Sequence, residues 1–394
     1  MSESEGADKT RRRGGSSPAS PASLPDDEDL LWEILLRLPP LPSSLPRASA
    51  VCRRWRRLMT DPKFIARFRA HHRKPPLLGV FHRSSSGITF VPILDPPDRI
   101  RFDMRCYGDY DILGCRHGRV LAMNRWEGEV LVCDPVAGEQ HRVAAPSEFS
   151  RGIVNGAVLC PAADDQGHVH GGCPFKVVLM TLYPADHRPA ACVYSSETGT
   201  WGDLVKTPAI CQLNDAGIPG ALVGNALYWL QHRLGNAILV FDLDEQNLAV
   251  IEAPPVANGF RGRSSRIIQA EGGAVGLAIL SYPRFQMWRR NVNCHGVATW
   301  AVWKTIEMHN IPGLPLIGRM NTILGYSEDT DAFFIFLEGD VYMVQFKSMQ
   351  SKRLHETEYI CNYHPFTSFY TPGIAIADGH DGVESHGTLD DSIV

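Results

Sequence analysis

The chain has 394 residues, of which 44% are hydrophobic and 21% are charged, and its formal net charge is −4. This composition is typical of a folded globular protein, and the length exceeds that of one typical domain. The charge is uneven, because residues 1–74 hold 15 Lys and Arg against 9 Asp and Glu, whereas the remainder holds 24 against 34. This acidic balance argues against an extended nucleic-acid-binding surface in the larger, C-terminal part.

The two ends of the chain are polar. Residues 1–23 are rich in Ser, Gly and Pro, and residues 378–394 carry five acidic side chains and no Lys or Arg, so both are predicted to be disordered. The basic run at residues 9–13 is either a nuclear-import patch or a plain solvated tail. Ten cysteines without a C-x-x-C pair or a secretory signal, and no apolar run of about 18 residues, predict a cytoplasmic or nuclear protein without a membrane span.

Order is expected to begin with a helix in the stretch LPDDEDLLWEILLRLPP, residues 24–40. Asp26 can cap this helix, the acidic residues after it favour the positive end of the helix dipole, and Pro39 and Pro40 stop it. Five apolar side chains fall on one face at helical spacing: Leu30, Leu31, Ile34, Leu35 and Leu38. That face needs a partner to bury it.

A second helix is predicted over residues 44–59, SLPRASAVCRRWRRLM, with Ser44 as its cap and Pro46 in its first turn. On a helical wheel, the apolar residues fall within an arc of about 120°, and four arginines lie on the opposite side of the helix. The apolar residues are Val51, Cys52, Trp55, Leu58 and Met59. Because the tryptophan points away from the arginines, this basic segment is a poor stacking platform for nucleic acid, and its arginines are expected to be a solvated face.

A third helix is predicted in DPKFIARFRAHH, with Asp61 as cap and Pro62 at the first helical position. Phe64, Ile65 and Phe68 lie on one side of it. Three short helices make a core too small to be robust alone, so we expect another protein to complete part of their apolar surface.

These motifs resemble an F-box, the adaptor-binding module of cullin-based ubiquitin ligases. The resemblance covers residues 24–72 and rests on four motifs in order: Leu24-Pro25, IL-x-x-LP ending at Pro39, VC-x-x-W from Val51 and DP-x-F from Asp61. The exit FRAHHRKPPLLGVF also resembles the large F-box families of grasses. The proline-rich linker PPLPSSLP, with Pro46 where many members have leucine, departs from the pattern and leaves the start of the second helix open.

The resemblance implies contact with a Skp-type adaptor and, through it, with a cullin scaffold. The residues that it places at or behind this contact are Leu24, Pro25, Ile34, Leu35, Leu38, Val51, Cys52 and Trp55. For Trp55 a purely intramolecular core role is equally favoured.

Beyond residue 76 the helical periodicity gives way to short apolar or alternating runs between Gly, Asp, Asn and Pro, which predicts an all-β body over residues 77–377. Three segments align without gaps as strand, four-residue turn and return strand: VCDPVAGEQ from Val132, VYSSETGTW from Val193 and VFDLDEQNL from Val240. A weaker copy lies near residue 346. Copies of one such hairpin, recurring at intervals typical of a propeller blade, indicate a β-propeller, and the β body is long enough for roughly six blades.

The body resembles the kelch-like propellers that follow F-boxes in plants, although it lacks a clean kelch double glycine. The expected fold is therefore a small all-α F-box of three helices followed by an all-β propeller of roughly six blades.

A search for catalytic or metal-binding residues yields only weak patterns. Cys160, His168, His170 and Cys173 are potential zinc ligands, but their spacing fits no standard zinc module and is typical of a long loop. Asp134, Asp242 and Asp244 lie at predicted turns, where a turn-forming role is more common than catalysis. No cofactor is expected.

Six tryptophans lie in the body, and two of them, Trp126 and Trp288, fall in predicted loops and are candidates for a partner-binding rim. Trp300 and Trp303 are an odd number of residues apart in one predicted strand, so they are expected on opposite faces, with one of them exposed.

The favoured interpretation is a non-catalytic adaptor: the substrate-recognition subunit of an SCF-type ubiquitin ligase, with the propeller holding a protein substrate whose identity the sequence does not give. Two alternatives belong to other classes, a propeller hydrolase and a nucleic-acid-binding regulator.

Overall fold

The computed structural model describes residues 28–104, 108–150, 152–160, 173–182, 188–209, 217–230, 237–254, 264–316 and 320–370. The predicted arm (1–23) and tail (378–394) lie outside these residues. The chain divides into two units, Met1–Leu38 and Pro39–Val394. Within the described residues, no helix has the length and apolar character needed to cross a membrane.

The first unit contains one described helix, α1 (Glu28–Leu36). A 3.2 Å bond from the Leu38 N–H to the Leu35 carbonyl closes a tighter turn after it. The helix ends before Pro39–Pro40, as predicted, because proline cannot continue the hydrogen-bond ladder. The cap expected at Asp26 lies outside the described residues.

The second unit begins with three helices rather than two. The predicted single helix over residues 44–59 is wrong: it is divided into α2 (Ser44–Ser49) and α3 (Arg53–Met59). Cys52, at the start of α3, has extended backbone angles, φ −160° and ψ 170°. The Ser49 hydroxyl donates to the Pro46 carbonyl at 2.7 Å, a local bond that competes with helix propagation.

The next helix, α4 (Pro62–His72), begins as predicted. The Asp61 carboxylate accepts a 2.8 Å bond from the Lys63 N–H, and Pro62 occupies the first turn. Phe64 and Phe68 are buried, and the Phe68 ring lies 6.4 Å from that of Phe369, so this helix packs on the end of the β body.

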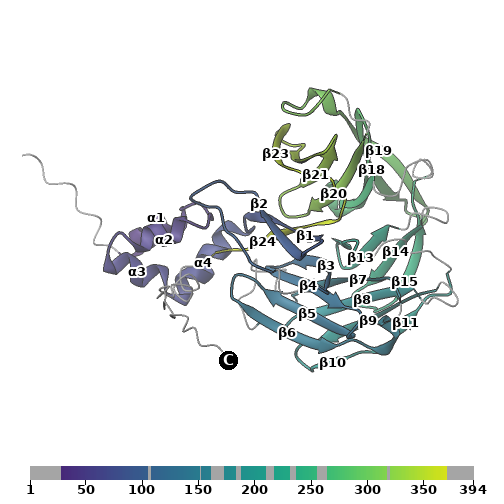
Figure 1. Ribbon diagram of the computed structural model, residues 1–394, viewed down its shortest axis with the longest axis horizontal. Coiled ribbons are helices and arrows are strands. Elements are labelled where there is room, and N and C mark those ends of the chain that lie inside the picture. The colour runs from purple at the N-terminus through teal and green to yellow at the C-terminus, as the bar shows by residue number, and fades with distance from the viewer. Residues whose placement is uncertain are drawn as a thin grey trace, which may run out of the picture. The chain divides into compact units, whose positions relative to one another are not determined.

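The rest of the second unit consists of six antiparallel sheets around a common centre, which is a six-bladed propeller (Figure 1). In five blades the strands run outward in chain order, and neighbouring blades touch mainly through their first strands. The first blade has β3 (Asp111–Arg116), β4 (Arg119–Asn124), β5 (Glu129–Asp134) and β6 (Glu139–Ala144). The second has β7 (Val154–Leu159), β8 (Lys176–Leu182), β9 (Pro189–Ser195), β10 (Thr200–Trp201) and β11 (Val205–Lys206).

The other three outward-running blades follow the same order. The third has β12 (Ala221–Val223), β13 (Ala226–Leu230), β14 (Ala237–Asp242) and β15 (Leu248–Glu252). The fourth has β16 (Ser265–Gln269), β17 (Val275–Ser281), β18 (Arg284–Val292) and β19 (Ala298–Glu307). The fifth has β20 (Asn321–Ser327), β21 (Ala332–Leu337), β22 (Asp340–Gln345) and β23 (Gln350–Glu356). Short 3₁₀ turns lie at Ser147–Phe149, Glu271–Gly273 and Met308–Asn310.

The sixth, closing blade joins the two ends of the β body. Its strands β1 (Leu77–Ser84) and β2 (Gly87–Pro92) come first in the chain, whereas β24 (Tyr363–Thr367) comes last. β24 pairs with β1, with His364 opposite Phe81, and contacts the innermost strands β20 and β3. The ring is therefore closed by hydrogen bonds between segments almost 290 residues apart in sequence.

Glycine allows the innermost strands to approach one another closely. A side chain at Gly325 of β20 would place its Cβ 2.5 Å from the Tyr363 carbonyl of β24. Apolar side chains fill the space between blades further out, as in the cluster of Phe285, Phe333 and Phe346 between the fourth and fifth blades.

The predicted repeat is confirmed as the outer hairpin of successive blades. Its copies at Val132, Val193 and Val240 form β5–β6, β9–β10 and β14–β15, and the weaker copy forms β22–β23. Asp134 and Asp242 form turns, because each carboxylate accepts two backbone N–H bonds at 2.9 Å from the residues that follow. Asp244 lies in the same turn as Asp242 and is exposed.

Candidate functional site

On α1, the apolar side chains divide between buried and exposed positions. Leu31, Leu35 and Leu36 are buried, whereas Leu30 and Ile34, one turn apart, are exposed, Ile34 at 41%. Leu35 can therefore support a contact only from behind, whereas Leu30 and Ile34 can touch a partner directly. Leu38 is half-buried, and Leu24 and Pro25 lie outside the described residues.

In the second unit, Val51 and Cys52 lie in the break between α2 and α3, and both are exposed, Val51 at 57%. The helical wheel that grouped them with Trp55 is wrong for these two residues, because the helix is interrupted there. The helical wheel is correct within α3, where Leu58 and Met59 are buried and Trp55 is half-buried. An exposed valine beside an exposed cysteine is an available apolar contact surface.

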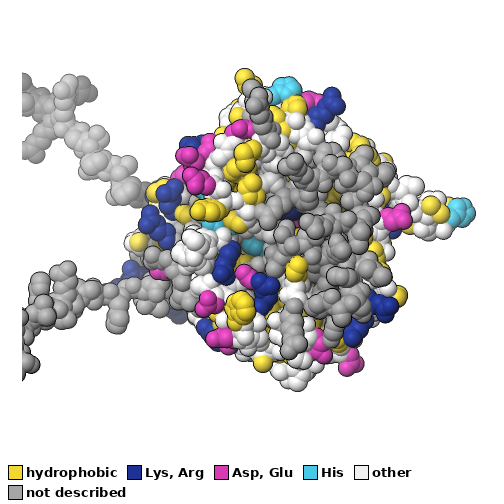
Figure 2. Space-filling model, turned by 45° about the vertical axis from the view of Figure 1, so that its right-hand side comes forward, with side chains coloured by type: hydrophobic (Ala, Val, Ile, Leu, Met, Phe, Trp, Pro, Cys, Tyr) yellow, Lys and Arg dark blue, Asp and Glu magenta, His cyan; other side chains and the backbone are white. Residues whose placement is uncertain are grey.

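The arginines of α3 all lie at the surface: Arg53, Arg54, Arg56 and Arg57. Arg56 and Arg57 occupy the last turn, where positive charge is favourable beside the negative end of the helix dipole. On the face shown in Figure 2, Lys and Arg side chains are interspersed with Asp and Glu. Among the described residues on this face, the mixture of both charges differs from the extended basic surface that nucleic-acid binding uses.

The propeller presents two faces, which we name by their strand ends. The entry face carries the ends of the innermost strands, such as Arg116 and Thr367, and also the start of β1, to which α4 is joined by residues 73–76. The far face carries the turns after the second strands, including β4–β5 and β1–β2. Because strands of a blade are antiparallel, Trp126, just after β4, lies on the far face.

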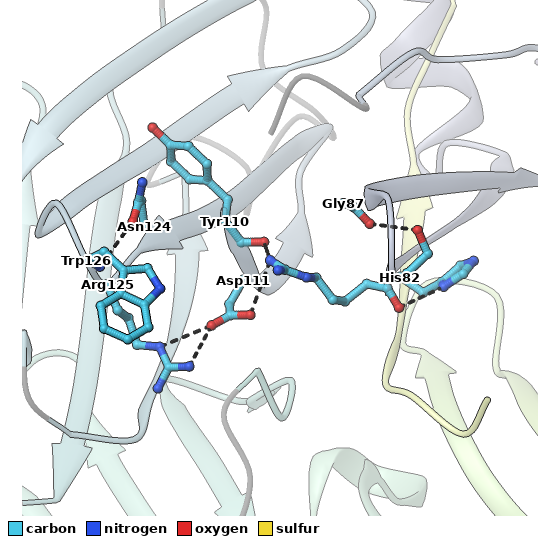
Figure 3. A network of polar contacts seen from close by, with 9 residues as sticks. His82, Gly87, Tyr110, Asp111, Asn124, Arg125 and Trp126 are labelled. Atoms are coloured by element: carbon cyan, nitrogen blue, oxygen red, sulfur yellow. Dashed lines mark hydrogen bonds and ion pairs between the residues drawn. The ribbon is translucent and has the colours of Figure 1, made fainter. Parts of the chain in front are cut away.

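Trp126 is 92% exposed and sits on a turn with fixed backbone geometry (Figure 3). The Asn124 side chain accepts a 3.0 Å bond from the Trp126 N–H, and Arg125 binds the Asp111 carboxylate at 2.9 Å. Arg83 of the closing blade lies 3.4 Å from the same carboxylate and donates to the Tyr110 carbonyl. The exposed indole is thus held on a turn that is tied to two blades.

The expected loop around Trp288 is wrong. Trp288 lies within β18, paired with Leu277, and is half-buried against the apolar cluster between the third and fourth blades. The run RFQMWRRN alternates between the two faces of a strand, and its arginines hid that pattern from sequence reasoning. Trp300 and Trp303 lie on opposite faces of β19, as predicted, but both are half-buried.

The four potential zinc ligands are only partly described, because His168 and His170 lie outside the described residues. Cys160 is buried and accepts a 2.7 Å bond from Arg119, whose other guanidinium nitrogen donates to the Cys173 carbonyl. Burial raises the pKa of the Cys160 thiol. Among the described residues, no three His, Cys, Asp or Glu side chains form a metal-binding group.

At the entry face, a cavity of about 570 Å³ occupies the centre of the ring, and all six innermost strands contribute to its walls. An ion pair crosses it: Arg116 of β3 contacts both Glu328 carboxylate oxygens at 2.7 Å. Glu328, which follows β20, also accepts a 3.0 Å bond from the Leu222 N–H of β12, and Arg116 donates to the Gly220 carbonyl at 3.2 Å. This cross-channel clamp joins the first, third and fifth blades.

Sequence reasoning missed the clamp. Arg116 and Glu328 are 212 positions apart, and each lies at the end of an apolar strand, where charged residues are common. The signal that sequence reasoning could have used was their position at the end of the first strand of a blade, which requires the blade boundaries to be known.

Two family models match the chain. The model described as "F-box domain" matches residues 22–67. The model described as "F-box protein AT5G49610-like, beta-propeller" matches residues 111–373, more than half of the chain. The narrower resemblance to the families of grasses stays a prediction. No curated protein sequence matches the chain.

Three solved structures show low similarity to the chain. The extracellular domain of a candidate one-component system of B. thetaiotaomicron is 13% identical, over 63% of this chain and 28% of that chain, with a TM-score of 0.31. A candidate 6-phosphogluconolactonase of Bacteroides uniformis is 13% identical, over 72% and 81%, with a TM-score of 0.33. Hydrazine synthase of Kuenenia stuttgartiensis is 10% identical, over 70% and 78%, with a TM-score of 0.34.

Proposed function

Because the chain belongs to the F-box protein AT5G49610-like β-propeller family, we propose that it is a substrate-recognition subunit of an SCF-type cullin ubiquitin ligase. The observation that carries this proposal is an F-box domain followed by a propeller in one chain, an architecture typical of such subunits. F-box proteins are typically non-catalytic adaptors, and an F-box implies binding to a Skp-type adaptor in general. The cytoplasm or the nucleus is the corresponding location.

In this proposal, the exposed apolar residues Ile34, Val51 and Cys52 contact the adaptor, and Leu35 supports that contact from inside. Trp55 and Leu38 are half-buried, and each is a proposed adaptor contact. Leu24 and Pro25 are proposed adaptor contacts on the resemblance alone. Exposed apolar side chains of this kind gain free energy when a partner removes them from water.

The propeller, in turn, holds a protein substrate, and the cullin scaffold brings that substrate to a ubiquitin-charged enzyme. The chemical benefit is proximity, since holding a substrate lysine near the thioester raises its effective concentration. We propose Trp126 as a substrate contact, because a large exposed aromatic on a fixed turn loses little entropy on binding. Trp288 is a weaker candidate because it is half-buried.

Co-purification with a Skp-type adaptor tests the proposal. Ile34→Asp and Val51→Asp should each weaken adaptor binding at least tenfold, because a charge would be buried in an apolar contact. Val297→Asp is the matched control, since Val297 is 56% exposed, close to the 57% of Val51, but lies in the β18–β19 turn.

Adaptor binding that is absent in the wild-type chain, or unchanged in both F-box variants, would contradict the proposal. A loss in Val297→Asp equal to that in Val51→Asp would show that the substitutions act through general misfolding, and the assigned surface would then be wrong. Circular dichroism of each variant supplies the folding readout.

A further inference from the structure

The central cavity at the entry face has the properties of a small-molecule site. Its volume, about 570 Å³, falls in the range of about 300–1,000 Å³ that ligand pockets occupy. Its walls come from six different blades, so its shape is fixed by the closed ring. Polar side chains from distant parts of the chain converge on it, which is the usual arrangement for orienting a ligand.

The charged groups of this cavity balance. Lys74 and Arg116 provide two positive charges, and Glu328 and Asp329 provide two negative charges. Arg116 and Glu328 neutralise each other in the clamp at 2.7 Å. Lys74 donates to the Asp329 backbone carbonyl at 3.2 Å, and the Asp329 carboxylate accepts from the Thr367 hydroxyl at 2.7 Å. A ligand with a net charge would therefore meet no net opposite charge here.

A buried histidine in the wall supplies a second, independent observation. His364 of β24 is only 3% exposed and lines the cavity, and its Nδ1 has no hydrogen-bond partner among the described residues. Burial, with smaller contributions from the Arg266 and His82 charges, lowers the pKa of His364 to about 3, so its ring is neutral. A neutral imidazole can accept a hydrogen bond through one ring nitrogen and donate one through the other. Because Nδ1 is itself inaccessible to solvent, a ligand in the cavity would reach this neutral ring only through its other atoms.

From this geometry we propose that the central cavity binds an uncharged, polyhydroxylated small molecule of monosaccharide or disaccharide size. A hydroxyl group donates one hydrogen bond and accepts two, so a polyol can donate to Asp329 and accept from Lys74 in one orientation. The site lies on the entry face, opposite the face that carries Trp126, and does not depend on adaptor binding. Occupancy of the ring centre would link the blades through the ligand.

The test is isothermal titration of the full-length chain with matched probes. Glucose, myo-inositol and sucrose are the neutral probes, and glucuronate and glucosamine keep the pyranose ring of glucose but carry a negative or a positive charge. At least one neutral probe should bind saturably, with half-saturation at about 1–5 mM, as expected for a ligand of this size. Both charged probes should bind at least about tenfold more weakly.

Two substitutions locate the binding. Asp329→Ala and Lys74→Ala should each weaken the binding of the neutral probe about tenfold or more, because each leaves a ligand hydroxyl without its partner. Asp109→Ala is the control, since Asp109 is exposed and does not line the cavity. The proposal is overturned if no neutral probe binds saturably at concentrations up to about 100 mM, 20-fold above the expected half-saturation. It is also overturned if a charged probe binds as well as glucose, or if both cavity variants bind the neutral probe like the control.

Discussion

The cross-channel clamp makes a strong prediction about stability, because one carboxylate holds three blades. Glu328→Gln keeps the size of the side chain and removes its charge. The Arg116 guanidinium then lies in the channel without its counter-ion, and its side chain is only 13% exposed, against 27% for Glu328. The amide can also no longer accept on both atoms, so one of the bonds from Arg116 or Leu222 is lost.

Removing one partner of a fully buried ion pair costs about 3–5 kcal/mol. Partial exposure of both side chains reduces that cost, and we expect the free energy of unfolding to fall by about 2–4 kcal/mol. For a propeller of this size, such a loss corresponds to a decrease in Tm of about 4–8 °C. The matched control is Glu127→Gln on the exposed β4–β5 turn, which should change stability by less than about 0.5 kcal/mol.

The assay is urea denaturation followed by tryptophan fluorescence, with Arg116→Met and the Arg116→Met/Glu328→Gln double variant completing a cycle. The double variant should be more stable than the sum of the single effects predicts, by about 1–3 kcal/mol, because it leaves no unpaired charge. Additive effects, or a Glu328→Gln variant as stable as Glu127→Gln, would refute the reasoning that the pair braces the ring.

Three further predictions concern the closing blade. Gly325→Ala should lower the free energy of unfolding by about 1–3 kcal/mol in urea denaturation, because its Cβ would meet the Tyr363 carbonyl, whereas Gly108→Ala, with nothing within 4 Å, should be neutral. Phe366→Ala should cost about 3–5 kcal/mol because the ring is 1% exposed, and a wild-type midpoint would contradict the assigned packing. The pKa of His364 is lowered to about 3 from its ordinary 6.5, so the unfolded chain binds a proton that the folded chain does not, and stability is lost as the pH falls below about 6.5. Between pH 7 and 4.5 this loss should be about 2–3 kcal/mol larger in the wild type than in His364→Gln, and equal slopes would disprove it.

Local signals allowed much of the fold to be predicted from the sequence. Asp61 with Pro62 marks the start of α4, and Asp134 and Asp242 mark turns, because each acts on backbone groups within three residues of itself. The repeat of strand, turn and strand predicted the propeller because each copy is one hairpin of one blade. Such features need no knowledge of distant residues.

The features that could not be predicted depend on tertiary context. The break at Val51 and Cys52 arises where Ser49 bonds back to Pro46, although helical periodicity alone continues through it. Trp288 looked like a loop residue because its neighbours are charged, and only the pairing of β18 with β17 places it in a strand. The cavity likewise exists only once all six blades are assembled.

The closing blade also has a consequence for synthesis on the ribosome. The helices and the strands β1 and β2 lie within the first 92 residues and are synthesised early. The strand that pairs with β1, β24, ends only at Thr367. At a translation rate of about 5–20 residues per second, β1 remains without its partner strand for about 14–55 s. During this interval the unpaired edge of β1 is open to pairing with the wrong strand, so the closing blade is the part of the propeller most exposed to mispairing during synthesis.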